Sequence, residues 1–295
     1  MRMSTVHLVI ITAIVAILSP VAARPVAAEE LKPFKDELFS SQTVLDKRDD
    51  GAFEIVDYQK QRDLYGRDKV PERRVKSAYV ALGVKRQQDD ETLMLGGRKL
   101  DVTRVGPATG AAFTVIFIHG RGGDRRLGAN DFMFGGNFNR LKNLATQNGG
   151  TYYSPSVRTF DSEGVADIAA LVRYASAQSQ GQPVILSCAS MGSIICWGIA
   201  RDAQTVKQLK GMAILGGETD NDFRTSAAFK AKLPVWFTHG SEDPVYAADG
   251  QEAFYEGLYK VGYPARFTLF QTGSHGTPVR MTDWRRVLNW ILAQN

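Results

Sequence analysis

A serine with the surroundings of a nucleophile follows one of the predicted buried strands. Ser190 comes just after the apolar run PVILS (183–187) and before a predicted helix, in the segment Cys188-Ala189-Ser190-Met191-Gly192. A sharp turn between strand and helix holds such a hydroxyl out at the helix N-terminus, where free N–H groups favour a developing anion. The segment matches the pattern G-x-S-x-G except that Cys188 replaces the first glycine. An ordinary N-capping serine remains the alternative.

An acid and a base follow two other predicted strands. Asp243 comes after PVWFTH (234–239) in a turn that ends at Pro244, where a turn-forming Asp-Pro pair is the alternative. Glu242 is a weaker candidate for the same acidic position. His275 stands in a Gly- and Ser-rich loop after ARFTLF (265–270). Because reactive groups gather at the carboxyl ends of parallel strands, we expect Ser190, Asp243 and His275 to meet at one edge of the sheet.

Two further histidines are less suited to act as a base. His119 and His239 each end a predicted buried strand directly before a glycine, a position that suits structural hydrogen bonds to neighbouring loops. His7 belongs to the N-terminal leader described below. Only His275 is therefore predicted to face a substrate.

The order Ser190, Asp243, His275 along the chain resembles the α/β-hydrolase superfamily, over about residues 75–295. The resemblance implies a mostly parallel central sheet with helices on both faces. It also implies that the loop in IFIHGRGGD (116–124), which is similar to the His-Gly-x-Gly loop of these enzymes, forms an oxyanion hole from the backbone N–H groups of Arg121 and Met191. The short segment 216–233 indicates that a large helical cap is absent.

The hydrophobic pattern of the chain agrees with that architecture, since strands and helices alternate as in a parallel sheet. Besides the three strands above, we predict strands at 113–119, 151–155 and 211–215, and helices at about 137–147, 163–178, 192–203, 251–261 and from 283. VKSAYVALGV (75–84) and KLDVTRV (99–105) are predicted as a pair of strands, separated by a charged segment and Gly96-Gly97.

The chain divides into three predicted parts. Residues 1–28 combine Arg2, an eleven-residue apolar run and small residues before Glu29, which is typical of a cleaved signal peptide and too short to span a bilayer. Residues 29–74 form an N-terminal extension in which 22 of 46 residues are charged, with helix, strand and a partly ordered arm as alternatives. Residues 75–295 are predicted to be the α/β-hydrolase domain. Without the leader, no segment is apolar for long enough to cross a membrane.

Composition limits the other functions that are open to the chain. It has 295 residues, two cysteines, 44% hydrophobic residues and a formal net charge of +5, which excludes a disulfide scaffold and does not favour nucleic-acid binding. A P-loop, a full dinucleotide fingerprint and paired metal ligands such as H-x-x-H are all missing from the sequence. We therefore expect neither a cofactor nor a metal.

Several smaller features are left with two interpretations. Arg121, Arg125 and Arg126 are expected to form a solvated surface cluster rather than to attract an acidic substrate group. The segment 132–134 (Phe-Met-Phe) is either core or the lining of an acyl pocket. We expect no disulfide between Cys188 and Cys196, because about two helical turns would separate their Cα atoms by more than about 7 Å.

These observations predict an exported serine hydrolase, periplasmic or extracellular, that cleaves a carboxylic ester through an acyl-serine intermediate. Its partner would be a small-molecule or lipid ester. A serine peptidase or amidase on the same fold and a non-catalytic binding protein with this fold are the alternatives. The sequence does not predict the acyl group, the alcohol or the oligomeric state.

Overall fold

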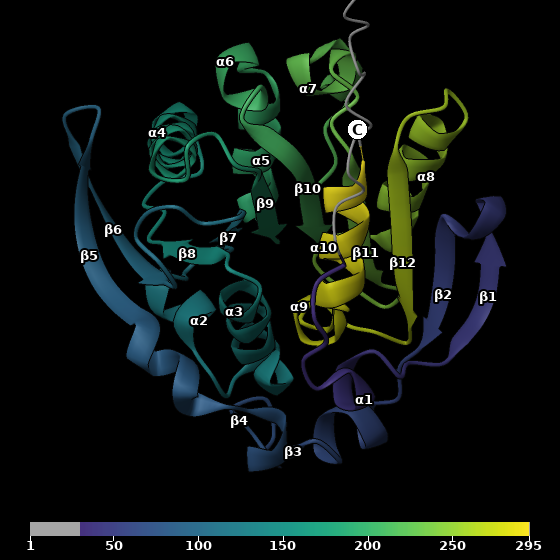
Figure 1. Cartoon of the computed structure of the whole chain (residues 1–295). Helices are drawn as coiled ribbons and strands as arrows, with labels where there is room; N and C mark the ends of the chain where they lie inside the picture. The colour runs from purple at the N-terminus through teal and green to yellow at the C-terminus, as the bar shows by residue number, and fades with distance from the viewer. Residues whose placement is uncertain (1–29, 295) are drawn as a thin grey trace, which may run out of the picture.

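A computed structural model describes residues 30–294, so the predicted signal peptide lies outside the described residues. The centre of the molecule is a ten-stranded sheet (Figure 1). In spatial order its strands are β1 (Val44–Arg48), β2 (Phe53–Asp57), β12 (Ala265–Gln271), β11 (Val235–Gly240), β10 (Leu209–Leu215), β9 (Val184–Ala189), β7 (Thr114–Ile118), β8 (Thr151–Pro155), β6 (Arg98–Val105) and β5 (Gln88–Leu95).

The sheet is mostly parallel, as the sequence predicted. Neighbouring strands from β2 to β8 run parallel, and only the β1–β2, β8–β6 and β6–β5 pairs are antiparallel. Every residue of β7, β9 and β11 is buried, because helices cover these strands on both faces. The parallel strands end at one edge of the sheet, which brings the loops that follow them together.

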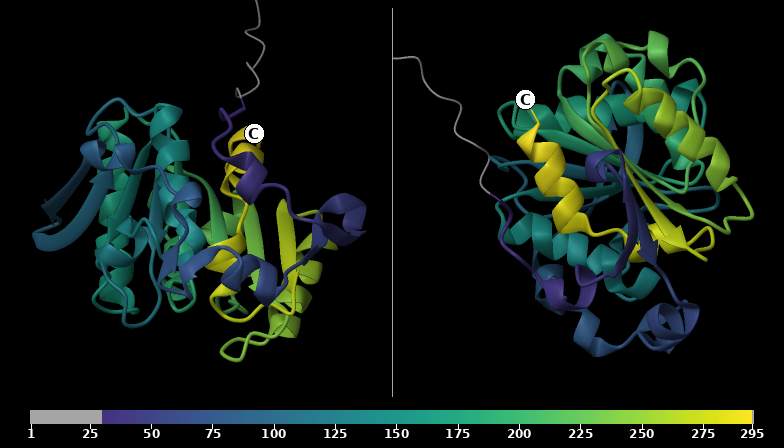
Figure 2. Two further views of the ribbon diagram at one scale, coloured as in Figure 1. Left: turned by 90° about the horizontal axis from the view of Figure 1, so that it is seen from below. Right: turned by 90° about the vertical axis from the view of Figure 1, so that its right-hand side faces the viewer.

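Helices cover both faces of the sheet (Figure 2). One apolar core includes residues of α4 (Ser162–Gln178), α5 (Gly192–Ala200), α6 (Ala203–Val206), α7 (Ala227–Lys230) and α8 (Ala248–Tyr259). The other includes residues of α3 (Asn137–Gln147), α9 (Thr277–Met281) and α10 (Trp284–Ala293), with α2 (Arg125–Ala129) packed at its border. In α10, Trp284, Val287, Leu288 and Ile291 are buried along one stripe, so this face of the helix is core. No helix among residues 30–294 is long and apolar enough to cross a bilayer.

The connection from β10 to β11 is short, as expected. It contains only the 3₁₀ turn η6 (Phe223–Thr225) and the single-turn helix α7. The fold therefore has no large cap at this position.

The predicted strand at 75–84 is wrong. The only strand there is β4 (Arg74–Val75), and the residues that follow form the 3₁₀ turns η3 (Ser77–Tyr79) and η4 (Leu82–Gln87). The partner of β6 is instead the charged strand β5, joined to it by Gly96-Gly97, whose φ angles are 56° and 80°. Two glycines with positive φ make a two-residue hairpin loop, so the strands must flank them directly.

The N-terminal extension is part of the sheet rather than a separate arm. Its strand β2 pairs with β12 in parallel, and β1 pairs with β2 at the outer edge, as the purple strands of Figure 1 show. The extension also holds α1 (Asp36–Phe39), the π-helical turn η2 (Gln61–Tyr65) and the small β3–β4 pair, in which β3 is Asp68–Val70. The extension thus contains both strands, β1 and β2, and short helical segments, so each of the two structures that the sequence left open is present.

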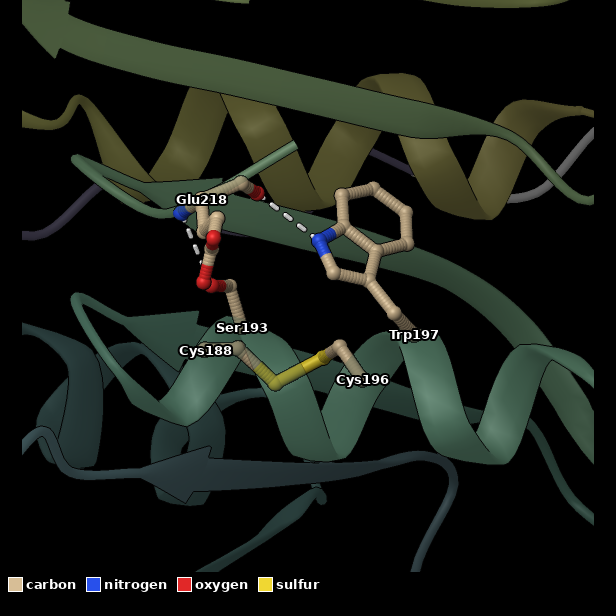
Figure 3. Close-up of a disulfide and its surroundings, with 5 residues drawn as sticks. All are labelled: Cys188, Ser193, Cys196, Trp197 and Glu218. Atoms are coloured by element: carbon tan, nitrogen blue, oxygen red, sulfur yellow. Dashed lines mark hydrogen bonds between the residues drawn. A yellow bond between two sulfur atoms is a disulfide. The ribbon is translucent and has the colours of Figure 1, made fainter. Parts of the chain in front are cut away.

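The expectation of two free cysteines is also wrong. Cys188 at the end of β9 and Cys196 in α5 form a disulfide, with their Cα atoms 6.3 Å apart (Figure 3). Helix α5 begins at Gly192, so Cys196 lies only about one turn into it and not two. The helix returns over the strand end at that point, which brings the two side chains within bonding range.

Hydrogen bonds fix the same helix to the loop after β10. The indole Nε1 of Trp197 donates to the carbonyl oxygen of Glu218 at 2.8 Å, and Glu218 N donates to Ser193 Oγ at 2.9 Å (Figure 3). Both serine and tryptophan belong to α5. The helix is thus held covalently to β9 and by hydrogen bonds to the segment after β10.

We expect the disulfide to stabilise the fold by about 2.5 kcal/mol, the value for closing a loop of roughly nine residues in the unfolded chain. The double variant Cys188→Ala/Cys196→Ala should lose about that free energy of unfolding in urea. Reductant added during the urea titration should lower the free energy of unfolding of the wild-type protein, because the disulfide is reduced in the unfolded chain. It should leave the free energy of unfolding of the double variant unchanged. Equal stability of the two proteins would show that the crosslink contributes nothing.

Candidate active site

The strand ends bring three predicted residues into one continuous chain of hydrogen bonds. Nε2 of His275 lies 2.8 Å from Ser190 Oγ, and its Nδ1 lies 2.8 Å from Asp243 Oδ2. Ser190 follows β9, Asp243 follows β11 and His275 follows β12. The structure therefore places together the serine, acid and histidine that the sequence singled out. Glu242, the weaker candidate, is exposed, and its side chain lies outside this chain of hydrogen bonds.

Ser190 occupies a turn with the geometry of a nucleophile elbow. Its φ is 53°, in the left-handed region that a non-glycine residue rarely adopts. Its backbone N–H donates to the carbonyl oxygen of Leu215 at 2.9 Å, and its carbonyl oxygen accepts from Ser193 N at 2.9 Å. These bonds hold the strained residue between neighbouring strand β10 and helix α5. Cys188 is accommodated in place of glycine, with its side chain buried in the disulfide.

Asp243 is a buried carboxylate, and both of its oxygen atoms lie within reach of N–H groups. Its Oδ1 accepts from the backbone N–H groups of Val245 (2.8 Å) and Tyr246 (3.2 Å), while Oδ2 lies against His275 and, at 3.3 Å, against His239 Nε2. Burial by itself would raise the pKa of Asp243, but the hydrogen bonds from His239, His275 and Val245 outweigh it and hold the pKa well below its usual range. The carboxyl is therefore ionised at neutral pH.

The two strand-end histidines make the structural hydrogen bonds that their positions predicted. His119 bridges its own loop and residue 157, with Nδ1 2.7 Å from the Gly120 carbonyl oxygen and Nε2 2.9 Å from Val157 N. His239 bonds to Gln251 Oε1 at 2.7 Å and to the Tyr246 carbonyl oxygen at 2.9 Å. The contact between His239 and Asp243 was not predicted, because it depends on the shape of the turn between them.

The backbone N–H groups of Arg121 and Met191, the predicted oxyanion donors, both lie near Ser190. Met191 follows Ser190 directly, and Gly120, the neighbour of Arg121, approaches Ser190 so closely that a Cβ there would lie 2.8 Å from Ser190 Cβ. Among residues 30–294, neither amide donates a hydrogen bond to another protein group. Two free donors beside the serine hydroxyl are the arrangement that an oxyanion hole requires.

An apolar cavity of about 430 Å³ opens at the serine and histidine. Its lining includes Phe117, Leu127, Phe134, Leu215 and Val279, together with Ser190, His275 and Arg121. Phe134 thus lines the cavity, whereas Phe132 lies beneath the Arg74 guanidinium, 4.1 Å from the ring centre. Of the nearby arginines, Arg125 and Arg126 are engaged with acidic residues and backbone, and only Arg121 faces the cavity.

The N-terminal extension supports one wall of this cavity. Asp68 of β3 accepts two hydrogen bonds from Arg280 of α9, at 3.0 and 2.8 Å, and both side chains are buried. Val75 N donates to the Phe132 carbonyl oxygen at 3.0 Å, just before η5 (Phe134–Gly136). Because α9 carries Val279 and η5 carries Phe134, the extension helps to position two lining residues.

Comparison with known proteins identifies the family. The sequence profile of the dienelactone hydrolase family matches residues 119–285, which is more than half of the chain. The chain belongs to the dienelactone hydrolase family. This hydrolase is thus an α/β-hydrolase, as the order of its serine, acid and histidine suggested. No curated protein sequence matches the chain.

Solved structures agree with this assignment at the level of the fold. A thermostable esterase superposes with a TM-score of 0.55 at 15% identity, covering 72% of this hydrolase, which spans only 64% of the esterase. An α/β serine hydrolase without lid from Xanthomonas campestris gives 0.52 at 17% identity, covering 70% and 94% of the two chains. A putative dienelactone hydrolase from Klebsiella pneumoniae gives 0.52 at 16%, covering 70% and 98%.

Gly120→Ala should impair the site without unfolding the hydrolase. The new methyl group would lie 2.8 Å from Ser190 Cβ and 3.2 Å from Oγ, and would displace the hydroxyl or the adjacent loop. We expect kcat/KM for an ester to fall by about 10²-fold, the cost of losing one oxyanion donor. Gly250→Ala, in helix α8 with no atom within 4 Å of the added Cβ, is the matched control and should keep full activity. Equal activity of the two variants would contradict the close approach at Gly120.

Proposed function

We propose that this chain is an exported serine esterase in which Ser190, His275 and Asp243 form a catalytic triad. The hydrogen-bonded series from Ser190 Oγ through His275 to the ionised Asp243, at the mouth of an apolar cavity, is the observation that carries the proposal. Family membership supports hydrolase chemistry, and the hydrogen bond between His275 and Ser190 supports Ser190 as the nucleophile.

In the proposed mechanism, Ser190 Oγ attacks the carbonyl carbon of the ester while His275 Nε2 accepts the hydroxyl proton. Asp243 orients His275 through Nδ1 and stabilises the imidazolium that forms. The N–H groups of Arg121 and Met191 donate to the tetrahedral oxyanion. His275 then returns the proton to the departing alcohol, which leaves an acyl-serine. A water molecule, deprotonated by the same histidine, hydrolyses that intermediate and regenerates the serine.

Export is supported by two independent features. The apolar leader at 1–28 has the layout of a signal peptide. The disulfide between Cys188 and Cys196 is of a kind that forms and persists in oxidising compartments and is rare in the cytosol. We infer a periplasmic or extracellular protein.

The nucleophile is tested by labelling the mature protein with a fluorophosphonate and mapping the modified peptide. Ser190 should carry the adduct, and both Ser190→Ala and His275→Ala should abolish labelling while folding normally. Ser274→Ala changes an exposed serine beside His275 and should label as the wild type does. An adduct elsewhere, or none on a folded sample, would contradict the proposed triad and favour a binding protein.

The cavity predicts esters with a short to medium apolar acyl group. Its volume of about 430 Å³ is in the lower part of the usual range for ligand pockets, and its walls are aromatic and aliphatic. Among p-nitrophenyl esters, kcat/KM should be highest for butyrate to octanoate and low for palmitate. Leu127→Trp, which narrows the cavity, should move the optimum to acetate, and Leu127→Ala should move it to longer chains. An optimum unaffected by both changes would show that the acyl group binds elsewhere.

A further inference from the structure

A second histidine lies beside the proposed triad and takes no part in the proton transfers described above. His239 ends β11 and its side chain is fully buried. Nδ1 lies 2.7 Å from Gln251 Oε1, and Nε2 lies 2.9 Å from the Tyr246 carbonyl oxygen and 3.3 Å from Asp243 Oδ2. Both ring nitrogens therefore face oxygen atoms.

Each of these oxygen atoms can only accept a hydrogen bond. The Gln251 amide is oriented by its other end, because Nε2 donates to the Gly217 carbonyl oxygen at 2.8 Å. A flipped amide would place two carbonyl oxygens against each other, so Oε1 must face His239. The Tyr246 carbonyl is an acceptor by nature, and the Asp243 carboxylate is ionised.

A neutral imidazole cannot satisfy this environment. It carries one N–H, so one of its nitrogens would present a lone pair to an acceptor in the interior, at the cost of an unmade buried hydrogen bond. The imidazolium, with an N–H on both nitrogens, donates to Gln251 Oε1 and to the Tyr246 carbonyl oxygen, and places its positive charge 3.3 Å from the Asp243 carboxylate. Burial alone would lower the pKa of His239, but hydrogen bonds to Asp243, Gln251 and Tyr246 together raise it.

His119 provides an internal comparison. It also ends a buried strand before a glycine, but the backbone N–H of Val157 donates to its Nε2, while Nδ1 donates to the Gly120 carbonyl oxygen. One donor and one acceptor suit a neutral ring. Burial lowers the pKa of His119, against a smaller opposing effect of that carbonyl. The two positions in the fold therefore differ in their partners: His119 has one donor and one acceptor, whereas the partners of His239 are all acceptors.

The groups that surround His239 come from the loops after β10, β11 and β12 and from helix α8. Asp243, in the loop after β11, is the ionisable side chain in contact with it, and His275, from the loop after β12, lies against the same carboxylate oxygen. Helix α8 contributes the neutral Gln251, and the segment after β10 contributes the backbone carbonyl of Gly217. Asp243 thus lies between two histidines.

We propose that His239 is a positively charged positioning residue that holds Asp243 in place and whose charge, on the same carboxylate that His275 contacts, extends activity to lower pH. This inference rests on the proposed function of the triad. Two cations on one carboxylate repel each other, so a positive His239 opposes a second positive charge on the ring of His275. The same repulsion weakens the stabilisation of the imidazolium formed during acyl transfer, which is the cost of the arrangement.

The sign of the pH effect follows from this charge. In His239→Gln the neighbouring cation and its repulsion are lost, so the acid limb of the kcat/KM profile should move to higher pH by about one unit. Gln251→Met keeps the ring but removes the acceptor at Nδ1, which permits a neutral histidine. It should move the acid limb in the same direction. Lys260→Gln removes an exposed cation directly after the same helix α8 and should leave the profile unchanged.

The charge of His239 is measured by NMR of the mature protein labelled with ¹⁵N-histidine, in the absence of substrate. His239, assigned by its absence from the His239→Gln spectrum or by the perturbation in Gln251→Met, should show two protonated nitrogens at neutral pH. His119 should show one. A neutral His239 at pH 7 would overturn the proposal. An imidazolium combined with an unshifted acid limb in both variants would overturn its influence on His275.

These measurements separate the inference from the proposed function. The NMR signature of His239 is independent of catalysis and remains if Ser190 proves not to be the nucleophile. Failure of fluorophosphonate labelling, in contrast, would contradict the triad while leaving the charge of His239 intact. If His239→Gln does not fold, Gln251→Met and the wild-type spectrum still decide the question.

Discussion

Burial of one carboxylate is the constraint around which the site is organised. An ionised Asp243 without partners would be prohibitively costly in the interior, so each of its oxygen atoms needs donors. Two come from the backbone of its own turn and two from histidines on different parts of the fold. The strands β11 and β12 must therefore end side by side, since one carries the acid and the other carries His275. Helix α8 must lie near enough for Gln251 to orient the second histidine.

The parallel sheet satisfies this constraint because its strands end at a common edge. There, loops from β7, β9, β11 and β12 converge, and side chains far apart in sequence meet within hydrogen-bond distance. The strained turn at Ser190 is held by backbone bonds to the strand β10 and by the helix that follows. A disulfide adds a covalent link between that strand end and the helix, where a glycine would be the usual residue. Rigid support of this kind keeps a serine in a costly backbone conformation.

The N-terminal extension contributes to the same region from outside the matched family segment. It lengthens the sheet by two strands and pairs Asp68 with Arg280 beneath the cavity wall. A buried pair of this kind needs both partners, because a single remaining charge would be left in the interior. The cavity next to Ser190 therefore depends on residues that precede the hydrolase core in the chain.

The sequence by itself determined the fold class and the three side chains at the centre of the site. Apolar runs bounded by small residues located the parallel strands from β12 to β8 but not β2, and reactive residues directly after those runs must meet at the sheet edge. The charged strand β5 was not predicted, because an edge strand with one solvated face has no continuous apolar run. The pair Gly96-Gly97 was the available signal of a hairpin there.

Only the tertiary structure decided the remaining features, because they depend on distances between elements. The predicted start of α5 at residue 192 was correct, but the disulfide depends on how the helix returns over the end of β9, which brings the two Cα atoms to 6.3 Å. Contact between His239 and Asp243, and the fixed orientation of Gln251 against Gly217, join a strand end, a turn and a helix. Side-chain hydrogen bonds across such elements arise from packing, not from periodicity. The sequence therefore identified the side chains that meet at the site, and the packing of the elements determined their contacts and burial.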